Sequence, residues 1–89
     1  MAYDIDFSDE ANADLYKLDQ SLILRITEKI IFFAQQPSPS AFGKILHGKL
    51  RGMVRFRVGD YRIVCLLDRE RRIIQVIRIG HRRDVYFPT

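Results

Sequence analysis

The chain has 89 residues, 47% of them hydrophobic and 29% charged, which is typical of a globular protein and excludes a disordered one. This length predicts a single domain over residues 1–89 and leaves no room for a separate cofactor-binding domain. The net charge of +4 is unevenly divided: residues 1–40 carry seven acids and three bases, whereas residues 41–89 carry four acids and twelve bases. The basic half predicts a polyanionic partner, with nucleic acid as the first candidate, although a basic surface that only keeps the chain in solution fits equally well.

No segment predicts export or membrane insertion. The apolar stretches are too short to span a bilayer, and the acidic N-terminal segment MAYDIDFSDE lacks the pattern of a signal peptide. The single cysteine, Cys65, stands in an apolar run, so we expect a buried, reduced thiol. We therefore expect a soluble cytoplasmic protein that does not contact a membrane.

The first half of the chain predicts a short strand and two helices. Residues 3–7 alternate apolar and acidic side chains, as a strand does. Ser8 is expected to cap a first helix that ends near Leu18, and Asp19 to cap a second helix. Apolar residues then recur at helical spacing until Pro37, whose ring disfavours a helical conformation in the residue before it.

The second half predicts a connector followed by a three-stranded antiparallel meander. Residues 37–52 are rich in proline and glycine, and residues 53–58, 61–67 and 72–79 read as strands joined by short turns. We expect Gly80 to end the third strand and a tail to follow. The fold class is therefore α/β (α+β), with the helices on one sheet face and the other face open to a ligand.

Several kinds of catalytic site are not supported. The two histidines, His47 and His81, have no partner at metal-ligand spacing, and the acids are scattered. No glycine-rich loop joins a strand to a helix, and the serines stand at caps or in the proline-rich connector. The sequence therefore predicts neither a metal nor a cofactor.

The meander concentrates arginines on one face. Arg55 and Arg57 share a strand face because side chains alternate, and the turn at Gly59–Asp60 returns Arg62 alongside Arg57. Cations this close repel unless an anion lies among them, and planar guanidinium groups suit phosphate oxygens. We expect an RNA backbone phosphate there. The same basic half carries Lys49, Arg51, Arg78, Arg82 and Arg83.

Cleavage of RNA without a metal needs proton transfers as well as cations. The 2′-hydroxyl attacks the adjacent phosphate, so a base must take its proton, cations must stabilise the added charge, and an acid must protonate the leaving oxygen. His81 is a candidate proton carrier, and Tyr86 a candidate acid or base-stacking ring. Two simpler roles remain open: His81 as a tail residue bonded to a backbone carbonyl, and Tyr86 as an aromatic at the core edge.

Three segments, KLRGM, RFRVGDYRIV and VIRIGHRRDVY, strongly resemble the RelE family of toxins from bacterial type II toxin–antitoxin pairs. The matched region covers residues 49–86, and the preceding strand and helices fit the order and length of the RelE-like microbial RNase fold. Each motif alone is weak, but together they are fairly specific.

The resemblance implies a ribosome-dependent endoribonuclease (an mRNA interferase) that cuts mRNA in the ribosomal A site and stops translation. It also implies a cognate antitoxin, RelB-like or other, that is encoded nearby and blocks the toxin. The family's active residues correspond to Arg55, Arg57, Arg62, Arg82 and Tyr86. We expect five further basic residues to contact mRNA or rRNA, namely Lys44, Lys49, Arg51, Arg78 and Arg83.

One departure from the family leaves the general base open. Family members often have lysines at the positions of Arg55 and Arg57, and a lysine loses a proton more readily than an arginine. Either His81 takes that role, or Arg57 assists only through its charge. This substitution also raises the question of whether the chain is fully active.

Two other functions fit the same sequence. The ParE branch of the superfamily poisons DNA gyrase and shares the Tyr-Arg-Ile pattern, but it generally lacks the tail tyrosine and much of the basic set. The segment HRRDVY therefore favours the nuclease. A non-catalytic RNA-binding module would need the arginines but neither His81 nor Tyr86.

Overall fold

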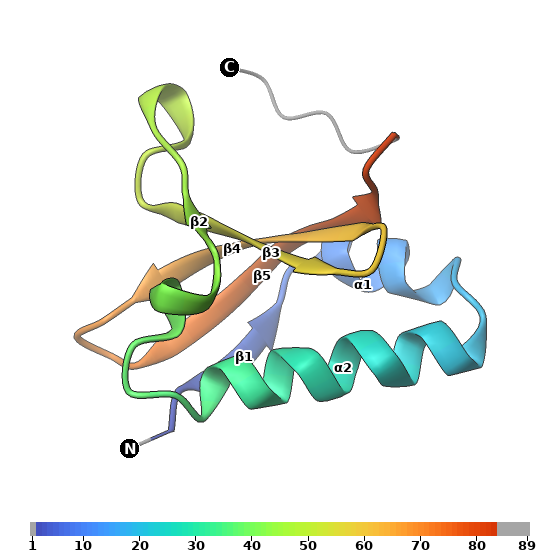
Figure 1. Cartoon of the computed structure of the whole chain (residues 1–89), viewed down its shortest axis with the longest axis horizontal. Helices are drawn as coiled ribbons and strands as arrows, with labels where there is room; N and C mark the ends of the chain where they lie inside the picture. The colour runs from blue at the N-terminus through green and yellow to red at the C-terminus, as the bar shows by residue number, and fades with distance from the viewer. Residues whose placement is uncertain (1, 84–89) are drawn as a thin grey trace.

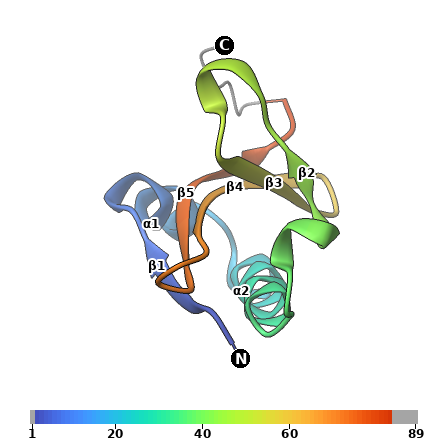
Figure 2. The same cartoon turned by 90° about the vertical axis from the view of Figure 1, so that its left-hand side faces the viewer.

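Two helices lie on one face of a five-stranded sheet in the computed structural model, which describes residues 2–83 (Figures 1 and 2). The predicted order of a strand, two helices and then antiparallel strands is confirmed. The elements are β1 (Asp4–Phe7), α1 (Asp9–Tyr16), α2 (Gln20–Ala34), β2 (Lys44–Ile45), β3 (Met53–Val58), β4 (Tyr61–Asp68) and β5 (Ile73–His81). Two 3-10 turns, η1 (Pro39–Phe42) and η2 (Gly48–Leu50), lie between α2 and β3.

Both helices begin at the predicted capping residues. The Ser8 hydroxyl accepts a hydrogen bond from the Ala11 amide at 3.0 Å, and the Asp19 carboxylate accepts one from the Leu22 amide at 2.9 Å. Each cap satisfies an amide that has no partner within its own helix. Helix α1 ends at Tyr16, slightly before the predicted end.

The core fills the space between α2 and the sheet. Ile26 and Ile30 of α2 are buried, and the Phe33 ring stacks on Phe56 of β3 with their centroids 4.3 Å apart. Cys65 of β4 is buried as predicted, and burial raises the pKa of its thiol to about 12. No helix in the described part of the chain is long and apolar enough to cross a membrane.

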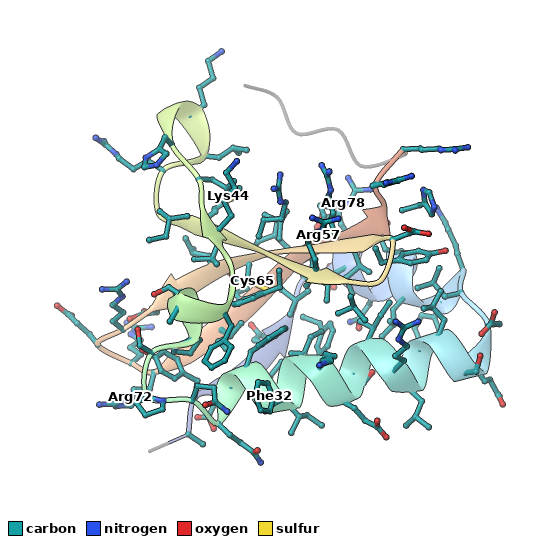
Figure 3. The ribbon with its side chains drawn as sticks, in the orientation of Figure 1. Phe32, Lys44, Arg57, Cys65, Arg72 and Arg78 are labelled. Carbon is teal, nitrogen blue, oxygen red and sulfur yellow. The ribbon has the colours of Figure 1, made fainter. Side chains whose placement is uncertain are left out.

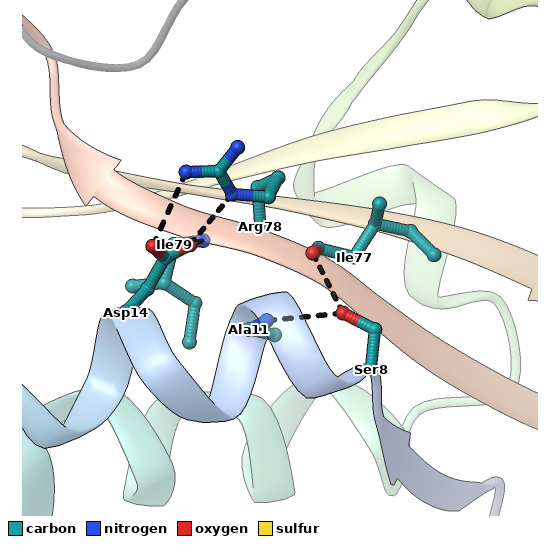
Figure 4. A network of polar contacts seen from close by, with 6 residues as sticks. All are labelled: Ser8, Ala11, Asp14, Ile77, Arg78 and Ile79. Carbon is teal, nitrogen blue, oxygen red and sulfur yellow. Dashed lines mark hydrogen bonds and ion pairs between the residues drawn. The ribbon is translucent and has the colours of Figure 1, made fainter.

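Strand β1 pairs in parallel with β5 at the edge of the sheet. Beyond the end of β1, helix α1 lies along β5 and its side chains bond the β5 backbone (Figure 4). The Ser8 hydroxyl donates to the Ile77 carbonyl at 2.8 Å, and the Asp14 carboxylate accepts from the Ile79 amide at 2.9 Å. The backbone groups that an edge strand would leave open at Ile77 and Ile79 are therefore satisfied by side chains.

Two sequence predictions need correction. The prediction that Gly80 ends the third strand is wrong, because β5 continues to His81 and Gly80 pairs with Arg62. Glycine weakens a strand but keeps both backbone hydrogen-bonding groups, so the ladder passes through it. The connector also contains a strand that the prediction lacks, since β2 pairs with β3 through Lys44 and Arg55. The meander is thus part of a larger sheet.

Candidate phosphate-binding site

The arginines of β3 and β4 lie on the sheet face opposite the helices. Val54, Phe56 and Val58 are buried in the core, so the alternating Arg55 and Arg57 lie on the other face. Strand pairing then sets Arg57 directly opposite Arg62 of β4. The pairing of Arg57 with Arg62 agrees with the prediction that the turn returns Arg62 alongside Arg57. We call Arg55, Arg57 and Arg62 the arginine cluster.

Two rows of residues cross this face. One row joins Lys44, Arg55, Val64 and Arg78 across β2, β3, β4 and β5, and the other row joins Arg57, Arg62 and Gly80. Figure 3 shows Lys44, Arg57 and Arg78 on the side of the sheet away from α2. We call the five cationic residues of these rows the basic face.

Val64 forms the floor of the basic face. It is fully buried although it lies opposite the core cluster, and its cross-strand neighbours are Arg55 and Arg78. Long basic side chains bury their apolar stems while the charged ends stay in water, and this accounts for the burial of Val64. The stems of Arg55 and Arg78 are therefore the side chains that cover Val64.

The arginine cluster has no anionic partner among residues 2–83. The ion pairs in that range are Arg71 with Asp68 and Arg78 with Asp14. Burial, together with the charges of Arg62 and Arg57, lowers the pKa of the Arg55 guanidinium from its ordinary value.

Two donors of the cluster are also unsatisfied. The Nε atoms of Arg55 and Arg62 are buried and have no hydrogen-bond partner within the described residues. A buried donor without a partner destabilises a fold by about 1–3 kcal/mol, and like charges directly across two strands repel. A phosphate between the guanidinium groups would relieve both effects, because their N–H forks match its oxygens.

Arg78 differs from the cluster because it already has a partner. Its Nε donates to Asp14 of α1 at 2.8 Å and its Nη2 donates to the other carboxylate oxygen at 3.2 Å (Figure 4). The hydrogen bond and the charge of Asp14 raise the pKa of Arg78. The structure therefore ties this predicted RNA contact to α1, at the edge of the basic face.

The predicted proton carrier lies on the other side of the sheet. His81 pairs with Tyr61, whose side chain packs against the core, and the two rings meet edge to face at 5.4 Å. Its Nδ1 accepts a hydrogen bond from the Arg83 amide at 3.2 Å. Strand alternation thus separates the His81 side chain from the arginine cluster.

The end of β5 is held against the turn between β3 and β4. The Arg82 amide donates to the Asp60 carbonyl at 2.9 Å, which brings Arg82 to the end of the sheet where Arg57 and Arg62 lie. Arg82 and Arg83 are exposed. Tyr86 lies outside the described residues.

The other predicted RNA contacts surround the cluster. Lys44 is exposed on β2, next to Arg55. Lys49 in η2 and Arg51 just after it are also exposed, on the loop that rises beside the sheet in Figure 1. Within residues 2–83, no group of three or more histidine, cysteine or acidic side chains could hold a metal ion.

Comparisons with known proteins agree with this fold. The family model described as "ParE toxin of type II toxin-antitoxin system, parDE" matches residues 5–86. Toxin RelG of Mycobacterium tuberculosis is 31% identical over 86 residues, which cover 97% of this chain and 98% of RelG.

Solved structures show the same architecture. A chain of the toxin–antitoxin complex RelBE2 from Mycobacterium tuberculosis superposes with a TM-score of 0.84 at 28% identity, covering 94% of this chain and 95% of that one. A chain of the intact E. coli RelBE toxin–antitoxin complex superposes with a TM-score of 0.73 at 21% identity, covering 90% and 96%.

The fold, the family match and the relatives together place the chain: it belongs to the RelE/ParE family of toxins of type II toxin–antitoxin systems. The resemblance to RelE toxins that the motifs in residues 49–86 suggested is confirmed.

Sequence reasoning missed two residues beside the site. Asp14 binds Arg78 across 64 positions of the chain, and no local pattern predicts that contact. Phe42 lies in the connector, where the prediction had no regular structure, yet it lines a pocket together with Lys44, Arg55 and Arg57. The clue in the sequence was an aromatic residue two positions before Lys44, in a basic connector.

Proposed function

We propose that this toxin is a ribosome-dependent, metal-independent mRNA endoribonuclease. The observation that supports it is the arginine cluster: three guanidinium groups on one sheet face without an anionic partner in the described residues, two of them with an unsatisfied buried Nε. A polyanion with regularly spaced phosphates suits such a face, and mRNA is one.

The cluster would act on the charge that develops at phosphorus. When the 2′-hydroxyl attacks, the phosphate gains negative charge, and arginines already gathered on one sheet face by the strand register would stabilise it. Arg55, Arg57 and Arg62 have this role in the proposal. The like-charge repulsion among the three arginines is offset further as negative charge builds up on the phosphate, so the transition state is bound more tightly than the ground state.

The proton transfers belong to the end of the sheet and the tail. Arginine is a poor base, so the proposal keeps His81, Arg82 and Tyr86 as the candidates for moving or positioning protons. Gly80 places no side chain next to Arg62 on the open face, which leaves room there for the substrate. The opposite orientation of His81 makes it the weakest member of this set.

The basic residues outside the cluster would dock the toxin on the ribosome. Lys44, Lys49 and Arg51 are exposed beside the cluster, and Arg83 is exposed after β5. Contacts of this kind with rRNA phosphates are additive and independent of sequence. They would restrict cleavage to mRNA that the ribosome presents.

We also propose a cognate antitoxin as the second partner. The relatives RelBE2 and E. coli RelBE are toxin–antitoxin complexes, as their names state. An antitoxin of this chain would be encoded nearby and would block its activity.

A short pulse of toxin expression without antitoxin tests the proposal. New mRNA 5′ ends should appear within translated frames and in phase with codons. The matched control is a reporter mRNA with its start codon removed, which should remain uncut. Cleavage of both reporters alike would show a nuclease that does not need the ribosome.

The family description gives a second candidate, a poison of DNA gyrase, because it names ParE. The same pulse separates the two functions. A gyrase poison would produce DNA damage and filamentation while mRNA stays intact. Binding to RNA with neither effect would indicate a non-catalytic RNA-binding module.

A further inference from the structure

A pocket of about 300 Å³ adjoins the arginine cluster at the edge of β3. Phe42, Gly43, Lys44, Arg55 and Arg57 line it, so its wall combines three basic residues with one aromatic residue of the connector. Its volume lies at the lower end of the range for small-ligand pockets, roughly 300–1,000 Å³. Because it shares Arg55 and Arg57 with the cluster, a ligand could occupy both sites at once.

Gly43 makes the pocket possible by allowing the connector to approach β3 closely. A Cβ at this position would lie 2.7 Å from Val54 Cγ1, 2.8 Å from the Arg55 carbonyl oxygen and 2.9 Å from Phe56 Cδ1. Any other residue would push the connector outward. The close approach sets Lys44 beside β3, where it pairs with Arg55, and leaves Phe42 just before the glycine, packed on Phe32 and Phe33 of α2.

The Phe42 ring is held in place while about half of it remains exposed. It meets Phe32 edge to face at 5.5 Å and lies 6.1 Å from Phe33, which itself stacks on Phe56 of β3. Its relative exposure is 48%. An aromatic side chain that packs on two other rings and is still half exposed at the rim of a pocket can stack with a planar ligand.

We propose that this pocket receives a nucleobase of the RNA, which stacks on Phe42 while its phosphate lies in the arginine cluster. This inference rests on the proposed function and extends it with a base subsite. A basic groove beside an aromatic ring is the common arrangement for single-stranded nucleic acid. An apolar segment of a protein partner fits less well, because it would bury Lys44, Arg55 and Arg57 without pairing their charges.

The test compares two small probes that differ only by the base. We expect the purified toxin to bind adenosine 5′-monophosphate at least about fivefold more tightly than ribose 5-phosphate, measured by NMR titration, because stacking adds to the phosphate contacts. Phe42→Leu should abolish that preference. Tyr16→Leu is the matched control, since Tyr16 is an exposed aromatic residue at the end of α1 and does not line the pocket.

A second variant gives a direct signal and guards against misfolding. The chain contains no tryptophan, so Phe42→Trp introduces the only indole. Its fluorescence should be quenched by adenosine 5′-monophosphate and not by ribose 5-phosphate, and the preference for the base should persist.

Three results would overturn the base subsite. The wild-type toxin could bind both probes equally, Phe42→Leu could retain the preference, or Tyr16→Leu could lose it to the same extent. A folded Phe42→Leu toxin that binds the nucleotide normally but loses antitoxin affinity would mark the pocket as a protein-docking site instead.

The probes need neither the ribosome nor cleavage, so the two proposals can fail separately. Cleavage on the ribosome together with a Phe42→Leu variant that keeps its nucleotide preference would reject only the base subsite. A preference that depends on Phe42 in a toxin that leaves ribosome-bound mRNA intact would reject only the nuclease.

Discussion

Asp14 joins three donors with one carboxylate, and it is the residue that connects α1 to the basic face. It accepts hydrogen bonds from Nε and Nη2 of Arg78 and from the Ile79 amide. Burial alone would raise the pKa of Asp14, but these hydrogen bonds and the charge of Arg78 outweigh it, so the pKa lies below the ordinary value of 3.8. A carboxyl with a depressed pKa stabilises the fold above its unfolded pKa, and this contribution is lost as the pH falls through the folded pKa.

Asp14→Asn should therefore destabilise the protein in a pH-dependent way. Near neutral pH we expect a loss of about 1–2 kcal/mol in the free energy of unfolding, toward the lower end for charged hydrogen bonds. The lower end applies because the Arg78 side chain is 46% exposed and solvent screens the pair.

Urea denaturation near pH 7 and near pH 3 measures this effect. The difference between Asp14→Asn and wild type should shrink at the lower pH, where the wild-type carboxyl is itself becoming protonated. Asp4→Asn, exposed on β1, is the control and should change little at either pH. An equally large loss for Asp14→Asn at both pH values would contradict the role of the ionised carboxylate.

Arg62, unlike Asp14, is expected to destabilise the fold while serving the proposed function. Its Nε is unsatisfied and its charge faces Arg57, so the residue opposes folding while its stem packs on the sheet. Arg62→Met keeps the stem and removes the charge. We expect the free energy of unfolding to stay level or rise by about 1 kcal/mol, while growth arrest by the toxin disappears. A folded Arg62→Met variant that still arrests growth would remove Arg62 from the site.

At the scale of elements, the approach of β2 to β3 depends on Gly43. Gly43→Ala should destabilise the protein by about 1–3 kcal/mol, because the added methyl meets a backbone oxygen that cannot move away. Lys44→Ala is the control: its side chain is exposed, so the loss should stay within about 0.5 kcal/mol. Thermal unfolding compares them. Equal stability of Gly43→Ala and wild type would show that the connector can shift without cost.

Local chemistry made most elements predictable. Ser8 and Asp19 have side chains suited to capping, and the strand at 53–58 shows strict alternation, so these predictions match the structure. Strand β2 has only two residues, which is too short for any periodicity. The parallel pairing of β1 with β5 joins distant segments, and a local pattern cannot reveal it.

The candidate site was predictable only in part. Alternation and the short turn predicted that Arg55, Arg57 and Arg62 share a face, and the register agrees. The orientation of His81 was not predictable once Gly80 was taken as the end of the strand. Because β5 in fact continues to His81, this residue pairs with Tyr61 and its side chain lies on the helix side.

At the scale of the whole molecule, the helices and the basic face occupy opposite sides of one sheet. The acidic first half of the sequence forms the helices and β1, whereas the basic second half forms the strands that carry the arginine cluster. Contact between the halves at the basic face runs through Asp14 and Arg78. This arrangement leaves one side strongly cationic. The proposed function therefore predicts that ribosome binding weakens steeply with added salt.

Cleavage of a defined mRNA on purified ribosomes tests the central claim most directly. Ribosomes are programmed with a defined mRNA so that the A site holds a codon but no tRNA. The cleavage rate is then measured for wild type, Arg62→Ala and Arg71→Ala. Arg71→Ala is the matched control because it is the same substitution, made on an exposed turn away from the cluster.

The account predicts that the wild-type toxin cuts the bound mRNA in the A-site codon but leaves free mRNA intact. A 2′-deoxy nucleotide at the cleavage position should block the cut. Arg62→Ala should lower the rate by at least about 100-fold, as expected for the loss of a charge-stabilising donor, while Arg71→Ala cuts normally. Wild-type cleavage by a folded Arg62→Ala toxin, or cleavage at the 2′-deoxy position, would contradict the claim that the arginine cluster stabilises attack by the 2′-hydroxyl.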